Sequence, residues 1–204
     1  MSSAPGRAER VHAVAGVVWP LMALGGFAVS GHAAAGGART FAAHVDGAAA
    51  GALPSLLVFT AALAVWLVTA VRARFVLGTD ESLRRLRRLI ALPAAAFAVT
   101  YAARVWGPVA LGGSDGRALF AALTDAFSHP VPAWLLAFGA AFGALQLEQS
   151  LRVLGETFGF PRRARLALWY RGFAIVFSVV LLVFVYDGLG ALIAGSPLFF
   201  GGAG

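Results

Sequence analysis

Four polar residues lie together near the end of the fourth long apolar segment: Gln146, Glu148, Gln149 and Arg152. Gln146 and Gln149 are three residues apart, so they share a helix face. Glu148 and Arg152 are four residues apart and can form an ion pair on a neighbouring face. Polar groups inside a membrane are costly without partners, so the glutamines either bond to adjacent helices or bind a ligand.

Three other residues that could take part in binding or proton transfer occur singly in the sequence. Trp66 supplies an indole N–H within the second apolar segment. Arg104 lies inside the third, and Asp187 lies just past the end of the fifth. Both an Arg104–Asp187 ion pair and extension of Arg104 to the outer surface are consistent with these positions. The chain has no cysteine, and no nucleotide-binding, zinc or hydrolase motif is evident.

The composition places these residues in a membrane. Of the 204 residues, 60% are hydrophobic and only 12% are charged, and the mean hydropathy is +0.82. A soluble domain of this size cannot bury so much apolar surface. We therefore predict a single all-α domain over residues 1–204, an integral membrane bundle of five transmembrane helices. The predicted spans are about 12–31, 52–71, 89–111, 131–153 and 166–186.

The segments between these spans are predicted as loops. Residues 31–51 are small and read as an outer loop that could include a short interfacial helix. Residues 112–130 form a polar outer loop, and 72–88 and 153–165 form basic loops. Residues 12–31 are too long for the apolar part of a signal peptide, so they are kept as the first span. Gly25, Gly26 and the Gly139–Gly143 pair are expected at close helix contacts.

Arginine placement predicts the orientation. All 16 basic residues are arginines; twelve fall on the N-terminal side of the membrane and two in the opposite loops. By the positive-inside rule, the N-terminus is cytoplasmic and the C-terminus is outside. The motif at 146–152 then lies at the cytoplasmic end of the fourth span.

The segment 146–159 (QLEQSLRVLGETFG) carries a family resemblance. It resembles the stretch His-Leu-Tyr-His-Gly, then Ser, then Gln-Thr-Leu-Gly, of the single-subunit, five-helix cytochrome b membrane anchor of succinate dehydrogenases and fumarate reductases. Residues 115–130 resemble the outer loop of that family, which also leads into helix four. His32 follows helix one as the family's helix-one histidine does, and Phe41-Ala-Ala-His44 resembles its Phe-Asn-x-Tyr-Ala stretch.

The resemblance implies a non-catalytic anchor subunit in the inner membrane of a bacterium. Flavoprotein and iron–sulfur subunits would dock on its cytoplasmic face, and the anchor would contribute to quinone binding and electron transfer. The residues expected around the quinone are Gln146, Glu148, Gln149, Arg152 and Trp66. Two alternatives remain open. One is a small transporter or channel using Arg104, Asp187 and Glu148, and the other is a structural accessory subunit of another respiratory or photosynthetic complex.

The histidines depart from the family pattern. Members commonly hold two haems b between four histidines on four helices, whereas here Gln149 replaces the helix-four histidine and Trp66 stands near the helix-two position. Bis-histidine ligation needs two imidazoles that face each other across the iron. We therefore expect fewer than two haems, or none. His32 is the candidate ligand, although a histidine at a helix end more often forms interfacial hydrogen bonds.

Overall fold

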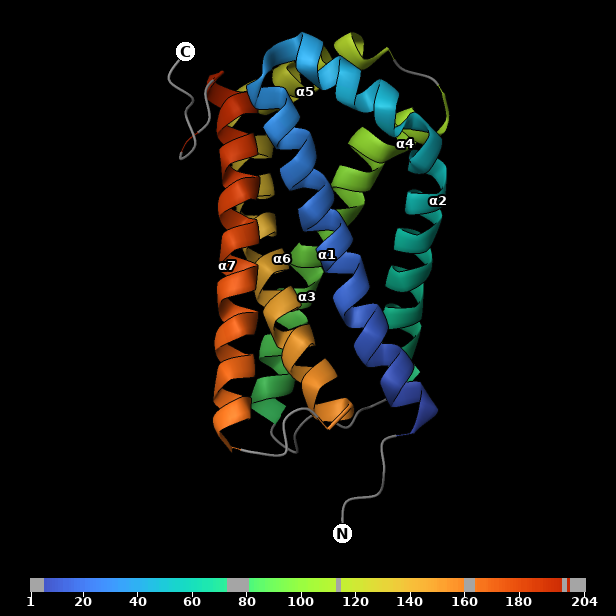
Figure 1. Cartoon of the computed structure of the whole chain (residues 1–204), viewed down its shortest axis with the longest axis vertical. Coiled ribbons are helices and arrows are strands. Elements are labelled where there is room, and N and C mark those ends of the chain that lie inside the picture. Colours follow the sequence, from blue (N-terminus) through green and yellow to red (C-terminus); the bar gives the residue numbers. More distant parts are fainter. Residues whose placement is uncertain (1–5, 73–80, 113–114, 160–163, 196–197, 199–204) are drawn as a thin grey trace.

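The computed structural model describes residues 6–72, 81–112, 115–159, 164–195 and 198, with side chains left out at 71–72, 81–88 and 164–165. All regular structure in these residues is helical (Figure 1). The elements are α1 (Arg7–Ala35), α2 (Gly37–Arg72), α3 (Glu81–Tyr101), η1 (Ala102–Trp106), α4 (Gly107–Ala110), α5 (Gly116–Ser128), α6 (Pro130–Thr157) and α7 (Ala164–Ala194).

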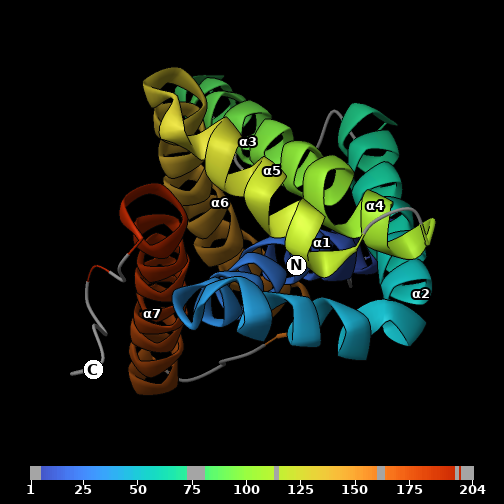
Figure 2. The ribbon, with the colours of Figure 1, turned by 90° about the horizontal axis from the view of Figure 1, so that it is seen from above.

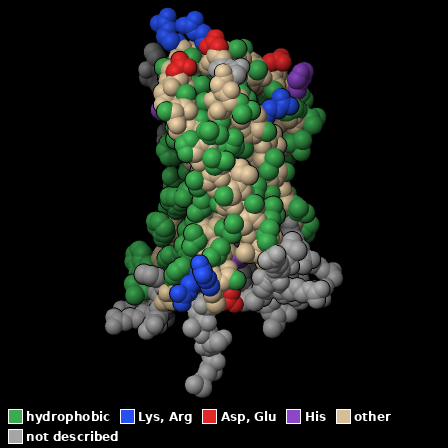
Figure 3. All heavy atoms as spheres, turned by 90° about the vertical axis from the view of Figure 1, so that its right-hand side faces the viewer, with side chains coloured by type: hydrophobic (Ala, Val, Ile, Leu, Met, Phe, Trp, Pro, Cys, Tyr) green, Lys and Arg blue, Asp and Glu red, His purple; other side chains and the backbone are tan. Residues whose placement is uncertain are grey.

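Five helical segments are long and apolar enough to cross a membrane, which confirms the predicted all-α, five-span architecture. They are α1, most of α2, the α3–η1–α4 unit, α6 and α7. Large apolar side chains such as Trp134, Phe138, Trp169 and Phe173 are exposed on the outside of the bundle. Figure 3 shows one such apolar face, with charged side chains gathered at its two ends. This distribution is typical of a helical bundle that is embedded in lipid and exposed to water at its two ends.

Helix α1 forms the centre of the bundle and packs against α7, α2, α6 and α3. Its inward face carries Trp19, Leu24 and Phe27, which are almost completely buried. Phe97 of α3 and Leu147 of α6 join them in the same core. Helix α2 is the least covered span and packs chiefly against α1, α4 and α5.

Residues 31–51, predicted as an outer loop that could include a short interfacial helix, are helical almost throughout. Residues 31–35 complete α1, and the helix that follows is longer than predicted. The chain turns at Gly36, and Gly37 has φ 83°, a left-handed conformation that glycine adopts without strain. Helix α2 starts there, and its first part lies across one end of the bundle (Figures 1 and 2). Phe41 and Val45, four residues apart, are buried beneath it, so the segment is an amphipathic helix.

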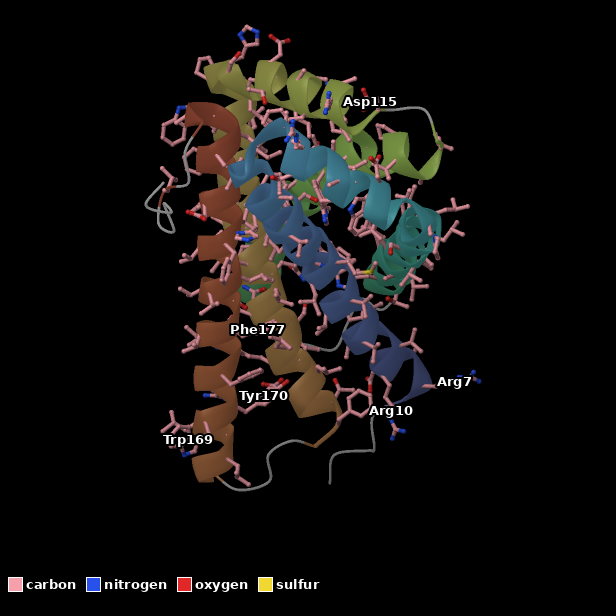
Figure 4. The ribbon with its side chains drawn as sticks, turned by 45° about the horizontal axis from the view of Figure 1, so that its top comes forward. Arg7, Arg10, Asp115, Trp169, Tyr170 and Phe177 are labelled. Carbon is pink, nitrogen blue, oxygen red and sulfur yellow. The ribbon has the colours of Figure 1, made fainter. Side chains whose placement is uncertain are left out.

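The predicted loop at 112–130 is also mostly helix. Helix α5 lies across the same end as the first part of α2 (Figure 2), and Asp115 caps it by accepting a hydrogen bond from the backbone N–H of Arg117. Leu119, Leu123 and Phe127 repeat every four residues on its buried face. We call this the capped end. The opposite, arginine-rich end holds Arg7 and Arg10 (Figure 4) together with Arg152.

The fifth span is longer than predicted. Helix α7 continues to Ala194, so Asp187 lies inside the helix, where it is buried, and not just past its end. The extra length follows from residues 188–194, which are apolar or glycine and continue the packing against α1. Gly31 and Gly188 bring the two backbones into direct contact there.

The glycine predictions have mixed outcomes. An added Cβ would lie 2.5 Å from Cζ2 of Trp106 at Gly26 and 2.7 Å from Cβ of Phe97 at Gly139, so both are confirmed as close contacts. At Gly143 the nearest atom would be at an ordinary 3.4 Å. The prediction of a close helix contact at Gly25 is wrong, because nothing lies within 4 Å of the position that its Cβ would take.

Candidate functional site

A group of polar and aromatic side chains from three helices lies towards the arginine-rich end. Helix α1 contributes residues at 12, 16 and 19, which share a face because they follow helical spacing. Helix α2 contributes two residues near its end, and α6 contributes two in its last turns. We call this group the His12–Gln146 cluster. Its members are His12, Gly16, Trp19, Trp66, Thr69, Gln146 and Ser150.

The contact between His12 and Thr69 fixes the position of a proton. The hydroxyl oxygen of Thr69 lies 2.6 Å from the carbonyl oxygen of Val65, and two oxygens at that distance must share the hydroxyl hydrogen. The same oxygen lies 2.8 Å from Nδ1 of His12. Because the threonine proton is already used, we infer that Nδ1 donates to the Thr69 oxygen and that His12 carries a hydrogen there. The backbone carbonyl of Trp66 is a further hydrogen-bond acceptor for the His12 ring.

Trp66 links the histidine to the interior. Its ring stacks on His12 with centroids 6.1 Å apart, and it lies against Trp19 with centroids 5.4 Å apart. Gly16 makes room for this arrangement. A Cβ at that position would lie 3.2 Å from Nε1 of Trp66 and 3.3 Å from Oγ of Ser150. Trp66 and Ser150 therefore meet over the same spot on α1.

Gln146 reaches the cluster through Ser150. Both side chains are buried, and Nε2 of Gln146 donates a hydrogen bond of 3.0 Å to Oγ of Ser150. The amide has a second N–H and a carbonyl oxygen, so this bond uses only part of its capacity. Of the five residues expected around one quinone, Gln146 and Trp66 therefore belong to the same cluster, linked through Ser150 and Gly16.

The indole N–H of Trp19 is the unusual group in the cluster. Trp19 is completely buried, and its Nε1 has no hydrogen-bond partner among the described residues. An unpaired donor in an apolar interior costs about 1–3 kcal/mol. The cluster therefore contains a donor that an added acceptor would satisfy.

Two of the other predicted residues lie elsewhere on α6. Glu148 and Arg152 form the predicted ion pair. At 3.6 residues per turn they lie about 200° around the helix from Gln146 and Ser150 respectively. Gln149 is half-buried beside this face. The five residues expected around one ligand therefore do not form one group.

His32 lies far from the cluster. The sequence placed His32 just after the first helix, but it lies in the last turn of α1, where its side chain is exposed. Twenty residues of helix separate it from His12, a distance of about 30 Å, so these two histidines cannot face the same iron. His44 and His129 lie at the capped end, on α2 and before α6. Within the described ranges, no group of three or more His, Asp or Glu side chains is arranged to hold a metal.

Arg104 and Asp187 occupy different surroundings. Arg104 is exposed in the π-helical turn η1, where it lines a cavity with residues of α5 and α6. Asp187 is buried in α7. Their ion pair stays a prediction.

Sequence reasoning missed most of the α1 side of the site. The signal was present, since His12, Gly16 and Trp19 are spaced four and three residues apart. The sequence alone does not determine whether this face of α1 points towards Trp66 or towards lipid. Comparison with models of known protein families, with curated proteins and with solved structures found no match to this chain.

Proposed function

We propose that this protein is the membrane anchor subunit of a succinate:quinone oxidoreductase, and that the His12–Gln146 cluster receives the quinone headgroup. The anchor would be non-catalytic for succinate. It would hold a flavoprotein and an iron–sulfur subunit at the membrane, and electrons from that partner would pass to the quinone.

The unpartnered donor in the cluster carries this proposal. A quinone headgroup is a flat apolar ring with two carbonyl oxygens, and it needs hydrogen-bond donors at both. The N–H of Trp19 has no described partner, and Gln146 has an amide N–H beyond the one given to Ser150. The rings of Trp19 and Trp66, whose planes are tilted by 53°, offer two apolar surfaces against which the quinone ring can pack.

The cluster also contains a group suited to proton supply. Reducing a quinone to a quinol takes two electrons and two protons, and the two carbonyl oxygens become hydroxyls. His12 sits in the second turn of α1, near the arginine-rich end, and its Nδ1–H is held by Thr69. Its Nε2 can take a proton from water and pass it on. Glu148 lies on another face of α6 and has no part in this proposal.

The arginine distribution supports the docking face. We infer that the arginine-rich end faces the cytoplasm of a bacterium, as the positive-inside rule suggests. Three of these arginines, Arg74, Arg162 and Arg163, lie outside the described residues. Four others belong to the first turns of α3: Arg84, Arg85, Arg87 and Arg88. A soluble electron donor docked there would be close to the cluster, which matters for a chain expected to hold fewer than two haems.

One observation favours the transporter alternative. Asp187 is buried inside α7, and ionisable groups inside spans commonly mark ion or proton paths. Its neighbour Gly188, however, is closed against Gly31 by direct backbone contact, which leaves no room for a channel at that point. Uptake by proteoliposomes of an ion down an imposed gradient, abolished by Asp187→Asn, would favour the transporter instead.

Purification from the native host tests the proposal directly. A tag on this chain should recover a flavoprotein with bound flavin and an iron–sulfur subunit in equal amounts, identified by peptide mass spectrometry. The recovered complex should reduce a water-soluble dye with succinate as donor. The same tag on an unrelated multi-span protein from that host serves as the control. Recovery of the chain without succinate-oxidising activity would contradict the proposal.

A further inference from the structure

A second site lies at the capped end, away from the His12–Gln146 cluster. Helix α5 packs on α2, α6 and α7. Between α5, the α3–η1–α4 unit and α6 lies a cavity of about 900 Å³. Figure 2 shows α5 running across the end of the bundle beside α3 and α6.

The walls of this cavity are mostly apolar, and small side chains line part of the α5 wall. Ala118, Ala122 and Ala126 repeat every four residues along the α5 wall. Along α3 and η1, the lining runs from Pro93 to Arg104, a length of about 16 Å at roughly 1.5 Å per residue. The cavity is therefore an elongated groove that extends from the capped end towards the middle of the bundle.

The groove is continuous with the lipid-facing surface. Leu135 and Phe138 of α6 line it and are also among the exposed large apolar side chains. At that depth the surrounding medium is lipid, so acyl chains are the apolar groups able to enter. This identifies the bilayer as the source of the occupant.

Two opposite charges line the groove: Arg104, exposed in the π-helical turn η1, and Asp115, the N-cap of α5. Single π-helical turns are frequent at functional sites. A guanidinium pairs with phosphate, and a carboxylate pairs with a primary ammonium. His129 also lines the groove but belongs to the far end of α5, and Thr100 adds a hydroxyl next to η1.

We propose that this groove binds a membrane phospholipid whose headgroup carries both a phosphate and a primary ammonium. The acyl chain lies along the alanine wall of α5. Arg104 binds the phosphate and Asp115 binds the ammonium. Phosphatidylethanolamine has this chemistry, whereas phosphatidylcholine lacks the ammonium hydrogens and phosphatidylglycerol lacks the cation.

The test is native mass spectrometry of the full-length protein in mild detergent, with equal amounts of phosphatidylethanolamine, phosphatidylglycerol and phosphatidylcholine added. The wild type should retain one phosphatidylethanolamine in preference to the other two. Arg104→Gln should weaken retention of all three about fivefold, because one arginine near a lipid phosphate contributes roughly 1 kcal/mol. Asp115→Asn should remove only the preference for phosphatidylethanolamine, since asparagine caps a helix as well as aspartate does.

Matched controls separate the groove from the rest of the surface. Ala122→Phe fills the groove and should abolish retention, whereas Ala121→Phe changes an exposed neighbour outside it. Arg117→Gln and Asp125→Asn remove exposed charges of the same end that do not line the groove, and should leave binding unchanged. Equal retention of phosphatidylcholine by the wild type would overturn the proposal. So would wild-type binding by Ala122→Phe, or a retained isoprenoid quinone in place of phospholipid.

Discussion

Gly31 of α1 and Gly188 of α7 touch through their backbones. A Cβ added to Gly31 would lie 2.4 Å from Cα of Gly188, and the reciprocal distance is 2.5 Å. No side chain can yield at such a contact, so a methyl group on either residue must push the two helices apart. This crossing sets how closely the central helix approaches the last one, near the capped end.

Gly31→Ala should therefore lower the thermal unfolding midpoint of the purified protein, with a cost of about 1–3 kcal/mol for overpacking. Gly25→Ala is the matched control, because its Cβ would meet nothing within 4 Å. That change should raise the midpoint slightly, since alanine favours helix over glycine by up to about 1 kcal/mol. Intrinsic fluorescence during a temperature ramp measures both. Equal midpoints for the two variants would contradict the crossing.

Thr69→Val should change how hydrogen is shared between the two ring nitrogens of His12, without changing the fold. The variant keeps the shape of the side chain but removes the Thr69 oxygen as an acceptor for His12, and the backbone carbonyl of Trp66 remains. The preference for hydrogen on Nδ1 should weaken, and the ¹⁵N spectrum of labelled histidine in bilayers should report it. Thr60→Val is the control, because Thr60 is exposed and bonds only to the carbonyl oxygen of Leu56 in its own helix. A wild-type protein with hydrogen on Nε2 alone would refute the inferred proton position.

Single cysteines can test the orientation cleanly, since the chain has none. Asp125 is exposed at the capped end and Glu156 at the arginine-rich end. A membrane-impermeant maleimide should label Asp125→Cys in intact cells, and Glu156→Cys only after permeabilisation. The inverse pattern would place the arginine-rich end outside and remove the proposed docking face.

Haem content follows from the positions of the histidines. Two bis-histidine haems need four suitably facing imidazoles, and in this chain the Nδ1 of His12 is engaged by Thr69, while His32 is exposed about 30 Å away along the same helix. The purified protein should contain fewer than two haems b per chain. A reduced-minus-oxidised spectrum, with the haem extracted and quantified, measures this. A content of two haems per chain would contradict this expectation, because it would require haem ligands other than these histidine pairs.

The five spans could be predicted from the sequence because apolar length alone determines them. At the capped end, the sequence allowed a short interfacial helix within 31–51 but gave no sign of the helix at 116–128. The side chains of these segments are too small or too polar on average to resemble spans. Their helical character rests on Phe41, Val45 and Leu119, which become buried only when the bundle beneath them exists. Similarly, spacing alone predicted the Glu148–Arg152 pair. The approach of Ser150 and Trp66 to the same position on α1 depends on how three helices rotate.

The central claim is that a quinone accepts electrons at the His12–Gln146 cluster. Its most direct test compares two activities of the assembled complex: succinate oxidation with a water-soluble dye and with a quinone. Gln146→Leu and Trp19→Phe each remove one donor, so each should lower quinone reduction about tenfold, as expected for loss of a hydrogen bond of up to 1.5 kcal/mol. Dye reduction should stay at the wild-type rate. Trp134→Phe, the same change at an exposed position on α6, should leave both rates unchanged. Wild-type quinone reduction in both donor variants would contradict the account.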